Sequence, residues 1–426
     1  MSGVTKHIYD NDIYSINIMW NKQLKQIEKI LPYTYDERII INLLKKYYPH
    51  EWKSVEYKKR YYDTKDRYLI RKKGKNRYNM RRAEVLIRRN PKFKQLTSYK
   101  YKKEYKNNFN SEEKNKYEKQ LWIKREKKIN NIDVKICKAK AKTQTVIPVF
   151  LNEMIGLYER KTTSQKDKVY IIQELKKYYN PKVVNFFFKL NDTELNKQLR
   201  EIAFKHLQSF NYEPRLRKQK YMKIHTKNKK RRNYLKKVYP NEKYTIPYNP
   251  EELEYRIMNG PEQKMKTFDF FISHSSKNSR LVQKLIDYEN SKGKNVFCDW
   301  INDVDYLKRH LLCEATLKVI EWRLEQSNAI IFVKTEDSME SVWCNYELNY
   351  FSKLGKNIYY IDGNKILEDK FDLQEYDQEN YIDPEYEEKI VLQSELIGKQ
   401  NIEYSYAAEP PVQFRLSHLS RRSEPL

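Results

Sequence analysis

The chain has 426 residues, of which 39% are hydrophobic and 14% aromatic, and its 85 Lys and Arg against 57 Asp and Glu give a formal charge of +28. Residues 1–250 carry 63 basic and 25 acidic side chains whereas residues 251–426 carry 22 and 32, so we expect at least two domains. No stretch approaches the ~18 uncharged residues that cross a bilayer, and the first residues lead into no apolar signal segment, so we expect a cytoplasmic protein without a membrane span.

Residues 1–250 are expected to be mainly helical, in one or two subdomains. Apolar residues recur at helical spacing over residues 13–48, and Pro32 interrupts the pattern. A polar helix is expected over residues 112–129. The polar run at 191–194 contains residue types that cap helices, so it predicts a helix start.

Two segments of this part, residues 58–106 and 215–237, are strongly basic. The first is interleaved with four tyrosines: Tyr61, Tyr62, Tyr68 and Tyr78. A positive field with aromatic side chains suits non-specific binding of nucleic acid or another polyanion. The alternatives are solvated helix faces, or a surface for a protein partner or another copy of the chain. No helix-turn-helix, zinc-finger or RNP signature indicates base-specific recognition.

Residues 251–265 are expected to be a linker, because several prolines and a Gly-Pro pair surround or interrupt them. Beyond the linker, short apolar runs alternate with helical patterns, which is typical of a parallel α/β sheet. The predicted strands are Thr267–Ser273, Asn295–Cys298, Ala329–Val333 and Asn357–Ile361. The predicted helices are Ser279–Ser291, Cys313–Gln326 and Ser341–Lys353. This domain is expected to span residues 266–400, followed by a tail over 401–426.

The four cysteines are predicted to be free thiols. Cys137, Cys298, Cys313 and Cys344 form no C-x-x-C pair and no Cys/His spacing that would hold zinc. We therefore expect no metal site, and a reducing compartment.

Polar side chains follow three of the predicted strands. Ser273 and His274 end the first, Asp299 and Trp300 follow the second, and Lys334 and Thr335 follow the third. In a doubly wound sheet, ligands bind beyond the carboxyl ends of the strands, near the point where the strand order reverses. The sequence thus predicts a binding site at this edge.

Three segments here resemble TIR (Toll/interleukin-1 receptor) domains. Phe268-Asp269-Phe270-Phe271-Ile272-Ser273-His274 resembles their first box, and Trp343-Cys344-Asn345-Tyr346-Glu347-Leu348 is similar to the W-C-x-x-E-L segment on the third helix of plant and bacterial members. Residues 296–300 and the loop to Arg309 take the place of the second strand and its BB loop. The resemblance covers residues 266–400 only. The Pro-Gly pair of receptor-type BB loops and the Phe-Trp third box are missing, which favours a bacterial, TIR-like enzyme over an animal-type adaptor.

The resemblance implies a flavodoxin-like fold and, in enzymatically active members, cleavage of the nicotinamide–ribose bond of NAD. It implies that Glu347 is the catalytic residue of an NAD glycohydrolase or cyclase, that NAD is the substrate with no further cofactor, and that TIR domains self-associate. By resemblance the chain is an immune effector or signal producer of the antiphage type, in which residues 1–250 sense a trigger or assemble copies.

The residues themselves support a role for Glu347 to a limited degree. Glu347 lies four residues after Trp343 and three after Cys344, so its carboxylate shares a helix face with apolar groups. A partly desolvated carboxylate stabilises a nearby cation better than one in water does. The competing interpretation is an ordinary surface glutamate on an amphipathic helix.

The remaining candidate site residues are ligand contacts, each with a structural alternative. The pyrophosphate of NAD is expected near the strand-end segment Ser273, His274, Ser275, Ser276 and Lys277. Its serines are equally suited to capping the next helix. Asp299, Trp300 and Trp343 complete the candidate NAD contacts; Trp300 would stack on a base or the nicotinamide, although both tryptophans suit packing as well.

Two hypotheses from other classes stay open. One is a non-catalytic TIR scaffold that only self-associates. The other is a nucleic-acid-binding protein in which the TIR-like domain is regulatory, recognisable by a steep fall of affinity with salt.

Overall fold

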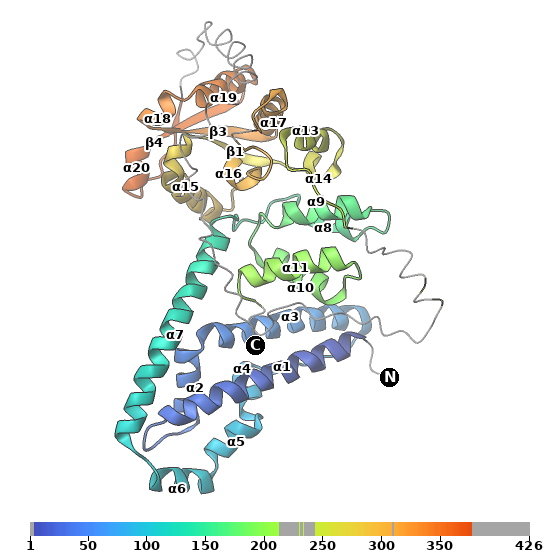
Figure 1. Ribbon diagram of the computed structural model, residues 1–426. Helices are drawn as coiled ribbons and strands as arrows, with labels where there is room; N and C mark the ends of the chain where they lie inside the picture. The colour runs from blue at the N-terminus through green and yellow to red at the C-terminus, as the bar shows by residue number, and fades with distance from the viewer. Residues whose placement is uncertain (1–3, 213–229, 231–232, 234–242, 309–310, 377–426) are drawn as a thin grey trace, which may run out of the picture. The chain divides into compact units, whose positions relative to one another are not determined.

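A computed structural model describes residues 4–212, 230, 233, 243–308 and 311–376, and the fold divides into two compact units (Figure 1). The first unit consists of Met1–Lys142 and Pro181–Lys243, and the second of Thr143–Asn180 and Tyr244–Leu426. Among the described residues, no helix is both long and apolar enough to cross a membrane.

The first unit is helical throughout its described part. Its elements are α1 (Val4–Ile27), η1 (Glu28–Ile30), α2 (Glu37–Tyr47), α3 (Pro49–Lys73), α4 (Ala83–Arg88), α5 (Pro91–Thr97), α6 (Tyr99–Asn107), α7 (Ser111–Lys140), α10 (Pro181–Thr193) and α11 (Lys197–Ser209). The break predicted at Pro32 is confirmed, because η1 ends at Ile30 and α2 begins at Glu37. Asp36 caps α2 by accepting a hydrogen bond from the Ile39 N–H at 2.8 Å.

The helix start predicted at 191–194 is wrong. Residues 191–193 are the end of α10, where the Asp192 carboxylate is buried and accepts a hydrogen bond from the Tyr61 hydroxyl at 2.9 Å. The next helix starts at Lys197, and Asn196 caps it. A short polar side chain does cap this helix, as expected, but it is Asn196 and not a residue of 191–194. Asp192 instead pairs with the buried Tyr61.

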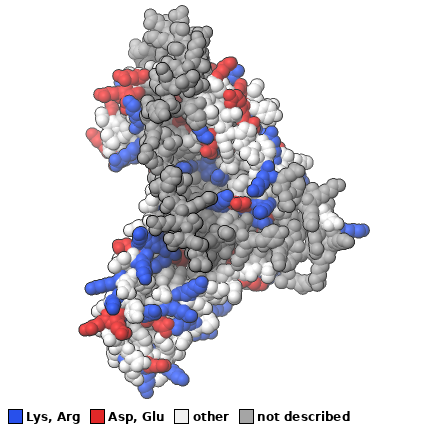
Figure 2. All heavy atoms as spheres, viewed as in Figure 1, with Lys and Arg blue, Asp and Glu red and all other residues white. Residues whose placement is uncertain are grey.

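Three of the four tyrosines in the basic segment 58–106 belong to the core. Tyr61, Tyr62 and Tyr78 are at most 7% exposed, whereas Tyr68 is 55% exposed. The Tyr62 hydroxyl donates to Asp12 at 2.8 Å. The buried rings are therefore not available to stack on bases, contrary to the expectation. Lys and Arg side chains are spread over the described surface of this unit with acidic ones among them (Figure 2). Most of the second basic segment, 215–237, lies outside the described residues.

The second unit is built around a mostly parallel five-stranded sheet in the order β2-β1-β3-β4-β5. The strands are β1 (Phe268–Ser273), β2 (Val296–Phe297), β3 (Ser327–Lys334), β4 (Asn357–Asp362) and β5 (Gln374–Glu375). The four predicted strands are confirmed within one or two residues at each end. The sequence did not predict β5, which pairs antiparallel with β4 and has only two residues. The order matches that of flavodoxin-like sheets, in which the switch point lies between β1 and β3.

Helices cover both faces of the sheet (Figure 1). The described helices of this unit are α8 (Leu151–Glu159), α9 (Gln165–Leu175), α13 (Pro250–Asn259), α14 (Pro261–Lys264), η2 (Ser276–Asn278), α15 (Ser279–Ser291), α16 (Asp299–Asn302), α17 (Glu314–Glu325), α18 (Glu336–Met339), α19 (Val342–Lys353) and α20 (Gly363–Leu367). Because side chains alternate along a strand, Phe271 packs with α17 and α19 on one face while Ile272 packs with α15 and α20 on the other.

Residues 143–180, which we expected in the amino-terminal region, pack within the second unit. The side chain of Gln144 lies against β2 at the edge of the sheet: its amide nitrogen donates to the Val296 carbonyl at 2.6 Å, and its oxygen accepts from the Val296 N–H at 3.3 Å. The Gln144 side chain thereby pairs with both the N–H and the carbonyl of Val296 on the edge strand. Without it, these two backbone groups would lack a partner from a neighbouring strand. The expected linker, 251–265, forms most of α13 and α14 and packs as part of this unit.

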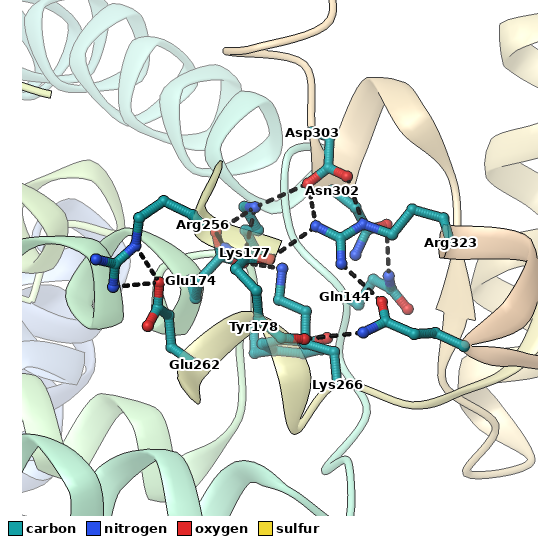
Figure 3. A network of polar contacts seen from close by, with 12 residues as sticks. Gln144, Glu174, Lys177, Tyr178, Arg256, Glu262, Lys266, Asn302, Asp303 and Arg323 are labelled. Atoms are coloured by element: carbon teal, nitrogen blue, oxygen red, sulfur yellow. Dashed lines mark hydrogen bonds and ion pairs between the residues drawn. The ribbon is translucent and has the colours of Figure 1, made fainter. Parts of the chain in front are cut away.

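A buried polar network joins these added helices to the sheet domain (Figure 3). Glu174 on α9 contacts Lys177 at 2.8 Å and also pairs with Lys266, and Lys177 reaches Asp303 at 3.5 Å. The cations beside Glu174 outweigh its burial and lower its pKa to about 2, while burial lowers the pKa of Lys266 to about 7. The sequence pattern shows only that these side chains are polar and not that they meet in the interior, so the network was not predicted.

Candidate active site

Glu347 lies on the second turn of α19, which begins directly after Ser341. The Ser341 hydroxyl caps this helix by accepting from the Cys344 N–H at 3.4 Å. The neighbours Cys344 and Leu348 are buried in the core between α19 and the sheet, whereas Glu347 is half-buried. The helix therefore holds the carboxyl at the boundary between the core and the surface, as the spacing to Trp343 and Cys344 predicts.

The carboxyl of Glu347 has a strongly altered affinity for protons. Burial is the main cause that raises its pKa from the ordinary value of 4.5 to about 8, and the negative charge of Asp299 contributes to this rise. The nearby Ser273 hydroxyl acts in the opposite direction. A positive charge on a ligand would stabilise the ionised form of such a carboxyl, which has a second carboxylate beside it.

Ser273 is the last residue of β1 and is fully buried. Its hydroxyl interacts with the Glu347 carboxyl and with the Cys344 thiol. The oxygen has no well-aligned hydrogen-bond partner among the described residues, so these interactions are weak in this conformation. Ser273 thus faces the carboxyl at the carboxyl end of the strand.

His274 follows Ser273, and its ring packs largely inside the unit with 6% of the side chain exposed. Its Nδ1 lies 3.0 Å from the Ile272 carbonyl oxygen. Its Nε2 faces Asp299, with 3.8 Å between this nitrogen and Oδ1. The first two strand ends, β1 and β2, are therefore brought together at this point, as expected from a parallel sheet.

Asp299 and Trp300 begin α16, directly after β2. Asp299 is exposed, and Trp300 is half-buried with its ring centroid 6.5 Å from that of His274. The Trp300 Nε1 is enclosed and has no hydrogen-bond partner among the described residues. An unsatisfied buried donor is unusual in a folded protein and marks a place where an acceptor group of a ligand would be favourable.

The serines and lysine after His274 have local roles. Ser275 caps the short helix η2, and Ser276 and Lys277 are exposed. The Lys277 ammonium pairs with Asp337 at 2.7 Å, which joins the loop after β1 to α18. The structural alternative proposed for the serines thus applies to Ser275, and Lys277 would have to exchange Asp337 for a phosphate to contact NAD.

Trp343 lies one turn before Glu347 and packs partly buried against the core cluster of α17 and α19. The side chains gathered around Glu347 are therefore Ser273 and Asp299, with His274 and Trp300 alongside them. Lys277 pairs instead with Asp337, and Trp343 packs against the core cluster.

Two residues near Glu347 were not among the predicted site residues. Cys298 and Cys344 are fully buried, and the charge of Glu347 acts on both thiols, whose pKa values burial raises. Cys298 ends up beside His274 because β1 and β2 pair in parallel, with Phe270 opposite Val296. The available signals were the position of Cys298 at the end of a predicted strand and that of Cys344 on the predicted helix, three residues before Glu347; local Cys/His spacing shows neither.

Two surface cavities in the described part of the chain lie away from Glu347. One is lined by Ile257, Met258, Lys264, Trp322, Glu325 and Gln326, and another by Tyr9, Asp10, Ile13, Asn17, Asn79, Arg81, Leu86 and Arg89. Neither cavity includes a predicted site residue.

Comparison with known proteins gives two relatives. The chain is 33% identical over 380 residues to the putative cyclic ADP-D-ribose synthase TIR2 of Cytobacillus dafuensis, which covers 89% of this chain and 97% of that protein. Over 114 residues it is 30% identical to the probable 3' cyclic ADP-D-ribose synthase ThsB' of Bacillus cereus (strain MSX-D12), which covers 26% of this chain and 58% of that protein. No family model and no solved structure matches. Since the first likeness covers 89% of this chain, it includes parts of both units.

Proposed function

This chain belongs to the family of TIR-domain proteins, and we propose that it cleaves the nicotinamide–ribose bond of NAD and releases ADP-ribose in a cyclic form. Both relatives are named as synthases of cyclic ADP-D-ribose, a product that contains NAD without its nicotinamide. The observation that carries the proposal is the half-buried Glu347, whose pKa burial raises to about 8 beside the switch point of the sheet.

In this reaction the main task of the protein is to stabilise the positive charge that develops as the nicotinamide–ribose bond breaks. When the bond between the ribose carbon and nicotinamide breaks, its electron pair leaves with the nicotinamide, and positive charge develops on the ribose. The ionised Glu347 carboxylate stabilises this charge, more strongly in its partly desolvated position than in water. A nucleophilic group on the same nucleotide then bonds to the ribose carbon and closes the cyclic product, whereas capture by water, with loss of a proton, gives the linear one.

The residues around Glu347 have supporting roles in this proposal. Trp300 presents its ring beside His274 and its unsatisfied Nε1 to the nucleotide. The backbone N–H groups at the start of η2 and α15, with Lys277, approach the pyrophosphate. Burial keeps the pKa of Glu347 high in the absence of substrate, and the charge of Asp299 adds to this effect.

The first unit is proposed to sense a trigger or to assemble copies, so that the enzyme acts as an intracellular defence effector or signal producer. Its helices hold no further candidate for the reaction among the described residues. The buried network through Glu174, Lys177 and Asp303 connects residues 143–180, which lie between the two stretches of the first unit, to the loop after α16. Residues 143–180 are thus joined through the chain to the first unit and through the contact of Lys177 with Asp303 to the loop that follows Asp299. A movement of this segment would therefore act on that loop.

Nicotinamide release from NAD tests the proposal. Wild-type protein at high concentration is expected to release nicotinamide, and Glu347→Ala to do so at least about 100-fold more slowly, because the charge-stabilising group is gone. The matched control is Glu340→Ala, which removes an exposed glutamate just before α19 and should keep the wild-type rate. Equal rates in wild type and Glu347→Ala would reject the assignment.

A further inference from the structure

Three side chains of metal-binding type converge where β1 and β2 end. The distances are 4.0 Å between His274 Nε2 and Cys298 Sγ, 3.9 Å between that Sγ and Asp299 Oδ1, and 3.8 Å between Nε2 and Oδ1. We propose that His274, Cys298 and Asp299 form a binding site for a divalent ion of the zinc type, beside Glu347, and that the bound ion inhibits the enzyme.

The spacing fits a tetrahedral ion after a small contraction. With bonds of about 2.0–2.3 Å to nitrogen, oxygen and sulfur, the ligand atoms of a tetrahedral zinc ion lie about 3.3–3.6 Å apart. The three atoms here are each within about half an ångström of that separation, which rotation of the exposed Asp299 side chain and small shifts of the others supply. All three residues belong to the second unit, so no relative placement of the units enters the geometry.

The imidazole of His274 is already oriented for coordination. Its Nδ1 lies 3.0 Å from the carbonyl oxygen of Ile272, so Nδ1–H donates there and the lone pair is on Nε2. This nitrogen faces the other two ligand atoms. Metal-binding histidines nearly always donate their second ring N–H to a carbonyl or carboxylate in this way, which fixes both the tautomer and the ring.

The set of donor atoms selects the kind of ion. A thiolate and an imidazole favour Zn²⁺ over Mg²⁺ or Ca²⁺, which prefer sites made of oxygen ligands. On binding, the Cys298 thiol loses its proton to solvent as the Zn–S bond forms, so uptake of the ion releases one proton and becomes tighter as pH rises. Because the Asp299 side chain is 53% exposed, the fourth position opens toward solvent and would hold a water molecule.

An ion in this place acts on the proposed reaction. Glu347 is within electrostatic reach of both Cys298 and Asp299. A dication beside Glu347 would offset the negative charge that stabilises the positive charge developing on the ribose. It would also occupy the side of the site where Trp300 lies. The inhibitory consequence rests on the proposed function, whereas binding of the ion does not.

The test of binding is a calorimetric titration of the metal-stripped full-length chain with Zn²⁺. Wild type is expected to bind one equivalent, with Cys298→Ser and the exposed-residue variant Asp299→Asn each weaker by at least about 10-fold. Cys137→Ser, which removes an exposed thiol of the first unit, is the matched control and should bind as wild type does. Titration with Co²⁺ should give a thiolate-to-metal charge-transfer band that Cys298→Ser lacks.

Wild-type affinity in both Cys298→Ser and Asp299→Asn, or the absence of any binding by wild type, would overturn the site. Circular dichroism of the variants separates loss of a ligand from loss of the fold, and Asp299→Asn keeps the inference testable if Cys298→Ser does not fold. In the parallel assay, Zn²⁺ should suppress nicotinamide release by wild type, with relief by a chelator. Unchanged release by the zinc-bound enzyme would overturn the inhibitory role, and a chain that binds zinc but never cleaves NAD would count against the proposed function alone.

Discussion

The Arg323 guanidinium donates from Nε to Oδ2 of Asp303 at 2.8 Å, and both side chains are fully buried. The same guanidinium donates from Nη2 to Gln263 at 2.7 Å. Asp303 directly follows α16 and lies four residues after Asp299. The pair of Arg323 with Asp303 therefore holds the start of the loop beside the candidate site (Figure 3). The helix α17 is thereby tied to the chain that leads away from β2.

Arg323→Met is expected to lower the free energy of unfolding by about 3–5 kcal/mol, because it leaves the buried Asp303 carboxylate without its main partner. Urea denaturation of the full chain measures the change. Arg88→Met makes the same substitution in the pair of Arg88 with Glu37, whose side chains are 49% and 47% exposed. This control should change the unfolding midpoint little, since exposed pairs contribute little. Equal effects of the two substitutions would show that the buried network is not stabilising the second unit.

The side chain of Gln144 is expected to stabilise the edge of the sheet. Gln144→Leu keeps the volume but leaves the N–H and carbonyl of Val296 without their side-chain partner, at a cost of about 1–3 kcal/mol. Amide hydrogen exchange at Val296 should become faster than at Phe332 in β3, the central strand. Unchanged protection of Val296 would mean that other groups satisfy this edge.

The rate of NAD cleavage should depend on the ionisation of Glu347. Since the reaction needs the carboxylate and its pKa in the free protein is about 8, kcat/KM should rise as pH rises through that value. Asp299→Asn removes a negative neighbour, lowers the pKa of Glu347 and should move this rise to lower pH. Ser273→Ala removes a group that favours the ionised form and should move it to higher pH.

These profiles are measured with a chelator present, so that no metal ion contributes. Shifts of both variants in the same direction, or a wild-type rate that does not change between pH 6 and 9, would contradict the electrostatic account of Glu347.

The periodicity of the sequence was sufficient for the sheet and its helices. The helix predicted at Ser279–Ser291 has these limits in the structure, since an apolar stripe and polar ends mark both of its boundaries. The strand β5 was missed because two residues are too few to show an alternating pattern. Residues 143–180 were expected in the amino-terminal region but belong to the second unit. A helical pattern shows which face of a helix is apolar, but it does not show against which unit that face packs.

The candidate site was predictable in part for the same reason. Ser273, His274 and Asp299 follow predicted strands, so the parallel sheet brings them together at one edge. The place of Glu347 came from the resemblance and from its spacing to Trp343 and Cys344. The group of His274, Cys298 and Asp299 was not predicted, because its members are joined by the pairing of β1 with β2 and not by proximity in the chain.

Glu347→Gln gives the most direct test of the role of the Glu347 charge, because it keeps the size and shape of the side chain and replaces the ionisable carboxyl by a neutral amide. Nicotinamide release from NAD is followed above the pKa of Glu347, where the wild-type carboxylate is ionised, and NAD binding is measured for both proteins. The account predicts that Glu347→Gln binds NAD but releases nicotinamide at least about 100-fold more slowly than wild type. Release at the wild-type rate by Glu347→Gln would contradict it.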